Sequence, residues 1–323
     1  MTEITQDPGS LHTPVLLERC LELLAPVASR PGAVVVDATL GMGGHSEALL
    51  EVHPGLTLIG LDRDTDALEL AGRRLEKFED RLIRVHTVYD GIESAVRGAG
   101  FDRIDGVLFD LGVSSLQLDE AERGFAYAQD APLDMRMDQS SGVTAAEVLA
   151  TASEGRLRAI FERYGEEPLA GRYARAIVAA RQEAPIERSL QLVEVLQQAT
   201  PAKIKDQRHP AKRVFQALRV EVNAELVALE AAIPAALGLL SMGGRAVVMA
   251  YQSLEDRFVK RLFAERSKST APQGLPVELP EHRPEFKLLT RGAELAGEEE
   301  RARNSRAIPV RLRAAERVRE AAL

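Results

Sequence analysis

The feature that most constrains the fold is a short apolar run that breaks on an acid and enters a glycine-rich turn. Residues 34–36 are all valine, Asp37 follows them, and Gly41, Gly43 and Gly44 come before a helical pattern. Glycine takes positive φ at little steric cost and lets a ligand approach the backbone, while the helix start offers free N–H groups. The segment predicts a strand-to-helix cofactor loop; the alternative is a tight turn with no ligand.

The spacing within this loop separates three classes of cofactor site. A phosphate-binding P-loop ends in Gly-Lys-Ser/Thr, whereas residues 44–46 here are Gly-His-Ser. A dinucleotide fingerprint started at Gly41 would place its third glycine on Ser46. The order of Asp37, Gly41 and Gly43 instead fits D-x-G/T-x-G-x-G, a pattern of S-adenosylmethionine (SAM) methyltransferases. We therefore predict SAM as the cofactor, rather than ATP or NAD.

Acids also end two later apolar runs. Residues 56–61 are mostly apolar and lead to Asp62, which can accept both hydroxyls of a ribose from the carboxyl end of a second strand. Residues 104–110 end on Asp110 and run into a small, polar loop. Enzymes that methylate amino groups of bases commonly have Asp/Asn-Pro-Pro-Tyr/Phe here, but this chain has Asp-Leu-Gly-Val. Three roles for Asp110 stay open: orienting an amino group, touching the cofactor or capping a turn.

Composition bounds the class of protein. The chain has 323 residues, 45% of them apolar, and a net charge of −8, which describes a soluble globular protein long enough for two domains. No run approaches the roughly 18 apolar residues of a membrane span, and the first residues lack a signal peptide, so we expect a cytoplasmic protein without a membrane partner. The single cysteine, Cys20, lies in a helical apolar pattern and is expected in the core.

The predicted elements divide the chain into two domains. The first third alternates strands and helices, which predicts a parallel sheet with ligands at the carboxyl ends of its strands. The middle of the chain is predicted to be helical, notably at 171–180 and 189–198. We predict an α/β, Rossmann-like SAM-dependent methyltransferase domain from 1–118 and 220–323, interrupted by an inserted helical substrate-recognition domain at 119–219. The predicted strands are 33–37, 56–62, 82–88, 104–110, 244–251, 286–290 and 308–313, with helices from 44 and over 64–78. The last two strands are candidates for an antiparallel edge.

Basic residues gather in two segments of this acidic chain. Residues 201–219 hold six basic residues against Asp206, and 301–319 hold seven arginines against Glu316. Such segments can form a phosphate-binding strip, with solvated helix faces as the alternative. The candidates for RNA binding are Lys212, Arg213 and Arg219. The two arginines can instead brace Glu221 and Glu225, and we favour the phosphate contact.

Eight motifs together resemble the MraW/RsmH family of bacterial ribosomal RNA methyltransferases. Leu133–Asp138 (LDMRMD) is far more specific than any glycine loop, and the match runs through most of the chain. The matching segments are 12–18, 37–46, 110–119, 122–125, 132–138, 164–167, 209–219 and 253–257. Two departures are modest: Tyr251-Gln252 stands where Phe-His is common, and Asn304-Ser305-Arg306 where Asn-Pro-Arg is usual.

The resemblance implies methyl transfer from SAM to the exocyclic N4 of one cytidine in the decoding region of small-subunit ribosomal RNA. It implies that SAM is held by Gly43, Gly44, His45, Asp62, Tyr89, Asp110 and Gln117. The expected partner is an assembled small ribosomal subunit with a splayed-out base between the sheet edge and the helical insertion. Asp110 or a neighbouring loop group would accept the amino hydrogens. No metal site is predicted, and a homodimer stays open.

Several of these residues also have a purely structural interpretation, in which they bind no ligand. Tyr89 can lie over an adenine or pack on the next helix as a rim aromatic. His45 can cap the start of its helix with its ring. Ser253 can cap a helix whose Leu254, Phe258 and Leu262 share one face. Leu133–Asp138 can form a short strand, although a substrate-side loop is favoured.

Two rival functions remain from the sequence. One is a SAM enzyme with another acceptor, such as a DNA amino group or a small molecule. The other is a non-catalytic RNA-binding assembly factor that has kept the cofactor fold. Binding of SAM analogues without turnover would favour the assembly factor. Loss of both basic segments without an effect on turnover would favour a small-molecule acceptor.

Overall fold

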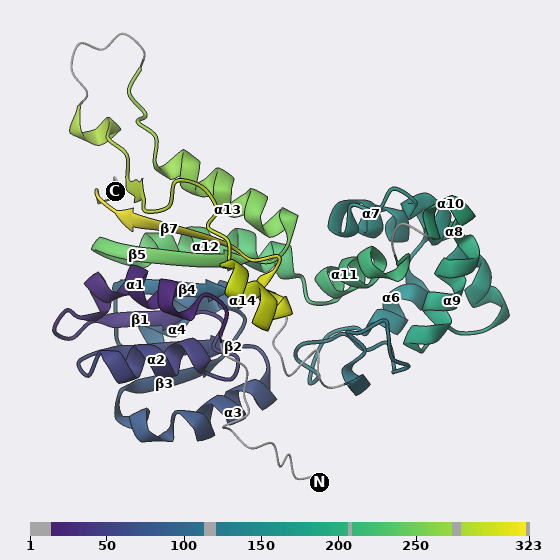
Figure 1. Ribbon diagram of the computed structural model, residues 1–323, viewed down its shortest axis with the longest axis horizontal. Coiled ribbons are helices and arrows are strands. Elements are labelled where there is room, and N and C mark those ends of the chain that lie inside the picture. The colour runs from purple at the N-terminus through teal and green to yellow at the C-terminus, as the bar shows by residue number, and fades with distance from the viewer. Residues whose placement is uncertain (1–13, 113–120, 206–208, 273–278, 321–323) are drawn as a thin grey trace. The chain divides into compact units, whose positions relative to one another are not determined.

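A computed structural model describes residues 14–112, 121–205, 209–272 and 279–320 of the chain (Figure 1). The chain forms two compact units. One comprises Met1–Gly112 and Val227–Leu323, and the other comprises Val113–Leu226. The first unit contains all the named strands and the second contains only helices and irregular segments among its described residues.

A seven-stranded mixed sheet forms the centre of the first unit, in the order β3-β2-β1-β4-β5-β7-β6. Neighbours from β3 to β5 are parallel, whereas β7 is antiparallel to both β5 and β6. The α/β class and the antiparallel edge predicted from the sequence are confirmed. The strands are β1 Val34–Asp37, β2 Thr57–Asp62, β3 Leu82–His86, β4 Ile104–Asp110, β5 Leu240–Ala250, β6 Phe286–Leu288 and β7 Arg311–Arg317.

Helices pack against this sheet and bury its apolar side chains. Helix α1 contacts β4 and β5, α2 contacts β2, and α13 contacts β5, β6 and β7. Leu24, Val35 and Leu58 are fully buried in one core, and each such side chain contributes about 1.5–3 kcal/mol. Cys20 is also in this core, as predicted. The helices are α1 Leu17–Ala28, α2 Gly44–Val52, α3 Thr65–Arg74, α4 Ile92–Gly98, α12 Glu225–Leu239, α13 Ser253–Arg266 and α14 Glu298–Arg303.

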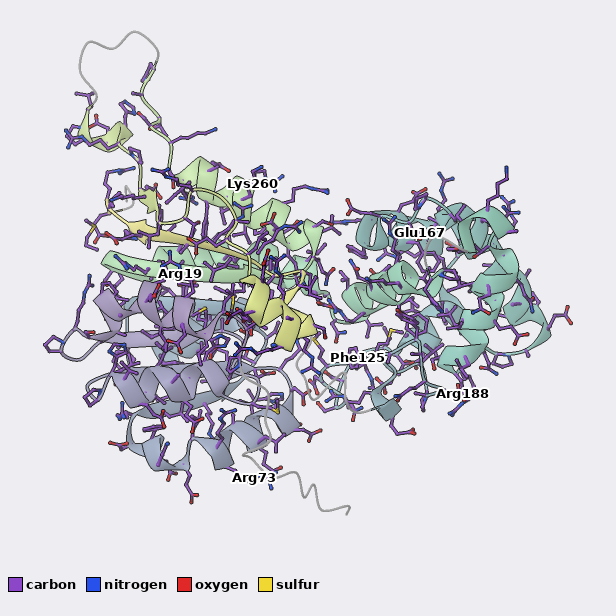
Figure 2. The ribbon with its side chains drawn as sticks, viewed as in Figure 1. Arg19, Arg73, Phe125, Glu167, Arg188 and Lys260 are labelled. Atoms are coloured by element: carbon purple, nitrogen blue, oxygen red, sulfur yellow. The ribbon has the colours of Figure 1, made fainter. Side chains whose placement is uncertain are left out.

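Polar contacts join parts of the first unit that are far apart in sequence. Arg19 on α1, labelled in Figure 2, forms an ion pair of 2.7 Å with Glu294, which precedes α14. The backbone N–H of Leu16 donates to the Glu300 carboxylate of α14 at 2.7 Å. The segment that precedes α1 is therefore held by the C-terminal part of the chain.

The second unit is a group of helices around its own core. Tyr173 and Phe161 are fully buried there, and the predicted helices at 171–180 and 189–198 are confirmed. Its elements are the 3-10 turn η4 Ala121–Arg123 and helices α6 Ala145–Thr151, α7 Glu154–Gly165, α8 Ala170–Glu183, α9 Ser189–Ala199, α10 Ala202–Lys205 and α11 Ala211–Val222. Within the described ranges, no single helix is long and apolar enough to span a membrane.

Several predicted boundaries are wrong. Strand β5 begins at Leu240 rather than at 244, β6 ends at Leu288 rather than at 290, and β7 continues to Arg317 rather than ending at 313. Three other boundaries differ for local reasons. The helix expected over 64–78 ends at Arg74 and is followed by the 3-10 helix η2 Glu76–Arg81, where Phe78 has φ of −118°. Strand β3 ends at His86, which pairs with Asp62, the last residue of β2. Strand β7 begins at Arg311 rather than at Ile308, which is 58% exposed and follows the 3-10 turn η6 Ser305–Ala307.

Candidate functional site

The glycine loop after β1 has backbone conformations and close contacts that favour glycine. Gly41 and Gly43 have φ of 51° and 79°, in the left-handed region. A Cβ on Gly43 would lie 2.9 Å from Leu75 Cδ1, and a Cβ on Gly44 would lie 2.5 Å from Pro14 Cγ. Gly43 is also the N-cap of α2. The close packing explains why the loop carries glycines at these positions.

Asp62 joins the end of β2 to this loop. Its Oδ2 accepts from the Gly41 N–H at 2.7 Å, and its Oδ1 accepts from the Asp64 N–H at 2.9 Å. Burial raises the pKa of Asp62 to about 6, although both backbone hydrogen bonds favour the ionised form. Each carboxylate oxygen keeps a second lone pair, so the group can still accept hydrogen bonds from two hydroxyls.

Asp37 has a structural part in the same loop. It is 2% exposed, and its carboxylate accepts from the Ser46 hydroxyl at 2.7 Å and from the Thr39 N–H at 3.2 Å. Burial raises the pKa of Asp37, and the charge of Asp110 adds to the rise. Ser46 was missed as a partner because the motif gave no sign that its hydroxyl turns back toward Asp37.

Asp110 is held by side chains from two other elements. Its Oδ1 accepts from the Tyr251 hydroxyl at 2.7 Å, and its Oδ2 lies 3.8 Å from His45 Nδ1. Its backbone N–H donates to Thr39 Oγ1 at 2.7 Å. Burial raises the pKa of Asp110, yet 27% of its side chain stays exposed. The carboxylate is therefore accessible to a ligand, while the hydrogen bond from Tyr251 fixes its orientation.

His45 uses its ring within the protein. The side chain is buried, and Nε2 lies 3.0 Å from the carbonyl oxygen of Val15. The ring does not cap α2, because Gly43 occupies the N-cap position. That alternative is wrong, and a cofactor contact by His45 would have to come from its backbone.

Of the two remaining predicted cofactor residues, the structure describes Tyr89 but not Gln117. Tyr89, in the 3-10 turn η3 Tyr89–Gly91, packs edge-to-face on Phe109 of β4 with ring centroids 6.1 Å apart. It follows β3 and lies at the same sheet edge as the glycine loop. Gln117 lies outside the described residues, with the rest of 113–120.

The site as a whole fits SAM. The glycine loop, Asp62, Tyr89 and Asp110 follow β1, β2, β3 and β4, and the carboxyl ends of parallel strands are where such sheets bind ligands. The acids at this edge raise one another's pKa, so a cationic sulfonium and ammonium would relieve their repulsion. The residues present therefore match both the ribose and the positive charge of SAM.

Tyr251 is the site residue that motif reasoning missed in this role. The sequence presented it only as a departure from the family pattern. Its place follows from strand register, since Asp110 of β4 is opposite Met249 of β5 and Tyr251 comes two residues later. A local motif does not show how two strands that are far apart in the sequence align in the sheet.

The predicted basic strips are largely used in internal contacts. Arg219 forms two hydrogen bonds of 2.8 and 2.9 Å with Glu225, and the side chains are 15% and 8% exposed. The bracing alternative is therefore present for Arg219, whereas Glu221 pairs with Arg156 instead. Arg213 donates to the carbonyl oxygen of Glu166 at 2.6 Å.

Two of the C-terminal arginines make internal contacts. Arg313 pairs with Asp256 at 2.8 Å, and Arg317 is 2% exposed and donates to the carbonyl oxygen of Leu237. These side chains join β7 to α13 and α12. Lys212, by contrast, is exposed on α11.

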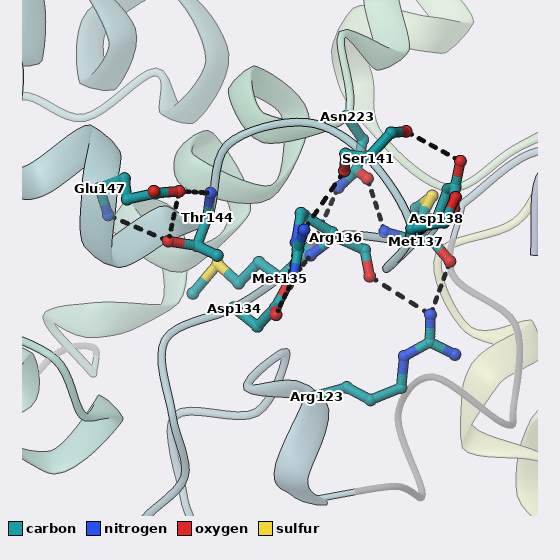
Figure 3. A network of polar contacts seen from close by, with 11 residues as sticks. Arg123, Asp134, Met135, Arg136, Met137, Asp138, Ser141, Thr144, Glu147 and Asn223 are labelled. Atoms are coloured by element: carbon teal, nitrogen blue, oxygen red, sulfur yellow. Dashed lines mark hydrogen bonds and ion pairs between the residues drawn. The ribbon is translucent and has the colours of Figure 1, made fainter.

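The Leu133–Asp138 motif is an irregular loop within the helical unit, not a strand (Figure 3). Met135 is fully buried at φ of 61°. Asn223 donates to the Met135 carbonyl at 2.7 Å and accepts from the Met137 N–H at 2.8 Å, while Arg123 donates to the Met137 carbonyl at 2.6 Å. This network holds the loop in shape and leaves the Asp134–Arg136 pair partly exposed.

The predicted cap of α13 is also corrected. Gln252 is the N-cap, in a capping box with Glu255, and Ser253 is the first helical residue. The buried face carries Glu255, Val259 and Phe263, one position on from the predicted face. The carboxylate of Glu255 accepts hydrogen bonds from the N–H groups of Tyr251 and Gln252, and these bonds hold the start of the helix.

Comparison with known proteins agrees with this arrangement. Residues 9–318 match the MraW methylase family. A relative named "Ribosomal RNA small subunit methyltransferase H" from Leifsonia xyli subsp. xyli is 66% identical over 311 residues, covering 96% of each chain. Another of that name from Clavibacter michiganensis subsp. michiganensis is 66% identical over 309 residues, covering 96% of this chain and 97% of that one. A third, from Saccharopolyspora erythraea, is 62% identical over 320 residues, covering 98% and 97%.

Proposed function

Because the chain belongs to the MraW methylase family, we propose that it transfers a methyl group from SAM to the exocyclic N4 of one cytidine in the decoding region of small-subunit ribosomal RNA. The observation that carries the proposal is the 62–66% identity, over nearly the full length, with relatives named as ribosomal RNA small subunit methyltransferases. The cytidine N4 is supported by the family resemblance of the motifs at 110–119 and 133–138. A cytoplasmic location follows from a ribosomal substrate.

SAM is the cofactor, and the residues at the sheet edge would hold it. Asp62 would accept the ribose hydroxyls, the loop at 41–45 would offer backbone N–H groups, and Tyr89 would lie against the adenine; Gln117 belongs to the same proposed set. When bound, SAM supplies a methyl group on a cationic sulfur, and its transfer leaves a neutral thioether. The loop and the acids would thus bind SAM, orient it and exclude water from its methyl group.

Asp110 is the proposed contact for the acceptor amine. The lone pair of a cytosine amino group is delocalised into the ring, so the nitrogen must be held while it pyramidalises toward the methyl group. The partly exposed carboxylate of Asp110 can accept a hydrogen bond from the amino group and take its proton. The Tyr251 hydroxyl fixes that carboxylate at the end of β4, and the His45 ring lies 3.8 Å from its other oxygen.

The helical domain, predicted at 119–219 between segments 1–118 and 220–323, is proposed to recognise the substrate. Lys212 and Arg213 are its proposed phosphate contacts, since Lys212 is exposed and Arg213 is partly so. Arg219 is already paired with Glu225, so its phosphate role is the weakest of the three. No homodimer is part of the proposal.

The test incubates the protein with methyl-labelled SAM and small ribosomal subunits from cells that lack this gene. The RNA is then digested and its nucleosides are identified by mass spectrometry. Label in N4-methylcytidine, lost in Asp62→Ala, is the expected result. Label in another nucleoside would overturn the N4 assignment, and no label on subunits or on naked ribosomal RNA would point to another acceptor or to a non-catalytic factor.

A further inference from the structure

The end of β5 brings a phenol to the carboxylate of Asp110. Strands β4 and β5 are parallel neighbours, with Asp110 opposite Met249. The N–H of Leu111 donates to the Met249 carbonyl at 2.9 Å, which continues the ladder beyond Asp110. Tyr251 follows two residues later, and its hydroxyl donates to Asp110 Oδ1 at 2.7 Å.

Tyr251 is itself fixed at its backbone and along its ring. Its N–H donates at 3.0 Å to Glu255, whose side chain is buried at the start of α13. The ring lies over Gly112, where an added Cβ would meet Tyr251 Cδ2 at 3.5 Å. Gly112 has φ of 109°, a conformation that side chains rarely adopt, so glycine allows the chain to turn beneath the ring. The phenol therefore reaches Asp110 from a defined direction.

We propose that Tyr251 is a positioning residue for the methyl transfer, and that it holds the Asp110 carboxylate ionised and correctly oriented toward the acceptor amine. This inference rests on the proposed function. Tyr251 donates to Oδ1 at 2.7 Å, whereas the His45 ring lies 3.8 Å from Oδ2, beyond hydrogen-bond distance. The Tyr251 hydroxyl therefore limits the rotation of the carboxylate, and alignment of reacting groups is what such a transfer chiefly requires.

The groups around Asp110 determine how the Tyr251 hydroxyl changes the pKa of Asp110. Burial raises the pKa of Asp110, whereas His45 on α2 and the Tyr251 hydrogen bond lower it. Asp37 on β1 is a like charge facing the same space, and the thiol of Cys20 on α1 is buried nearby with its pKa raised by burial and by Asp110. Removal of the Tyr251 hydroxyl should therefore raise the pKa of Asp110 and leave more of it protonated.

The first measurement compares wild type with Tyr251→Phe, which removes one oxygen and keeps the ring over Gly112. The expected result is a fall in kcat of about tenfold, a KM for SAM within about twofold, and an acid limb of the pH profile moved up by about one unit. The matched control is Tyr173→Phe, because that hydroxyl is also buried and bonded, to Thr200 Oγ1 at 2.8 Å. The control variant should keep the wild-type limb.

A second measurement reads Asp110 directly. Proteins with ¹³C-labelled aspartate carboxyl groups are titrated by NMR without RNA, and Asp110→Asn identifies the resonance. The Asp110 pKa should be higher in Tyr251→Phe, and the phenylalanine substitution should have no further effect on kcat in an Asp110→Asn background. An unchanged Asp110 pKa, or an unchanged kcat and acid limb in an active wild-type background, overturns the proposal.

The two proposals fail in different ways. If the wild-type protein methylates no ribosomal RNA, the proposed function is wrong, but the NMR titration still decides whether Tyr251 controls the Asp110 carboxylate. If the wild type is active and Tyr251→Phe matches it at every pH, the positioning role alone is wrong.

Discussion

The carboxylate of Asp62 and the backbone N–H of Gly41 are 2.7 Å apart, so the end of β2 holds the glycine loop that follows β1. The same carboxylate is the proposed acceptor of the ribose hydroxyls. Loop shape and cofactor binding therefore depend on one side chain, and its removal should damage both.

Asp62→Ala should weaken SAM binding by at least about a hundredfold, because it removes two charge-assisted hydrogen bonds to hydroxyls, each contributing about 1.5–3 kcal/mol. Isothermal titration calorimetry with SAM measures the effect. Asp66→Ala, on the first turn of α3, is the matched control and should bind within about threefold of wild type. Equal affinities for the two variants would show that Asp62 does not contact the cofactor.

The affinity for SAM should fall as the pH drops below about 6. Burial raises the pKa of Asp62 to about 6, and the ionised carboxylate is the form that accepts hydroxyl hydrogen bonds. We expect about a fivefold loss between pH 6 and pH 5, with proton release on binding near pH 6. Calorimetry in two buffers of different ionisation enthalpy measures that proton; binding without proton release at pH 6 would contradict the assignment.

The stability of the ligand-free protein should respond to the same group. A carboxyl whose folded pKa is raised from 3.8 to about 6 destabilises the fold when ionised. Its cost is absent below pH 3.8, grows between 3.8 and 6, and is complete above 6, reaching at most about 3 kcal/mol. The unfolding free energy of wild type relative to Asp62→Ala, measured in urea, should fall by about 2 kcal/mol as the pH rises from 4.5 to 7. A constant difference would contradict the raised pKa.

Arg219 and Lys212 should separate a structural from an RNA-binding role on α11. Arg219→Ala removes the guanidinium from a largely buried pair with Glu225 and should cost about 3 kcal/mol of stability. Lys212→Ala changes an exposed side chain and should alter stability by no more than about 0.5 kcal/mol. It should instead weaken binding to small subunits and reduce the salt dependence of that binding. The prediction fails if Lys212→Ala leaves the salt dependence unchanged.

Gly124 and Gly142 provide a matched pair in the helical unit. Both have positive φ, of 73° and 82°, but a Cβ on Gly124 would lie 2.1 Å from the Pro132 carbonyl oxygen, whereas one on Gly142 meets nothing within 4 Å. Gly142→Ala should cost about 1–2 kcal/mol from φ alone. Gly124→Ala should cost clearly more, because the chain beside Leu133–Asp138 must move. Similar losses for the two variants in urea unfolding would show that the chain at Pro132 adapts freely.

Local patterns in the sequence were sufficient for the elements and the cofactor loop. Apolar runs that end on Asp37, Asp62 and Asp110 indicated three parallel strands, and Gly-His-Ser at 44–46, where a P-loop has Gly-Lys-Ser/Thr, excluded a P-loop. These features depend on backbone geometry and on neighbours within a few residues, so they are legible without the fold. Boundaries such as the start of β7 were misplaced because Ile308 continues an apolar alternation but lies in a turn capped by Asn304.

The sequence by itself determined the α/β class, the glycine loop and the acids at the strand ends, because each follows from local chain chemistry. Only the tertiary structure decided the partners of those acids. Tyr251 reaches Asp110 from 141 residues away through the register of β4 and β5, and Arg219 turns to Glu225 instead of to solvent. Such contacts depend on how distant elements pack and on what burial does to a charge, and neither is encoded in a motif.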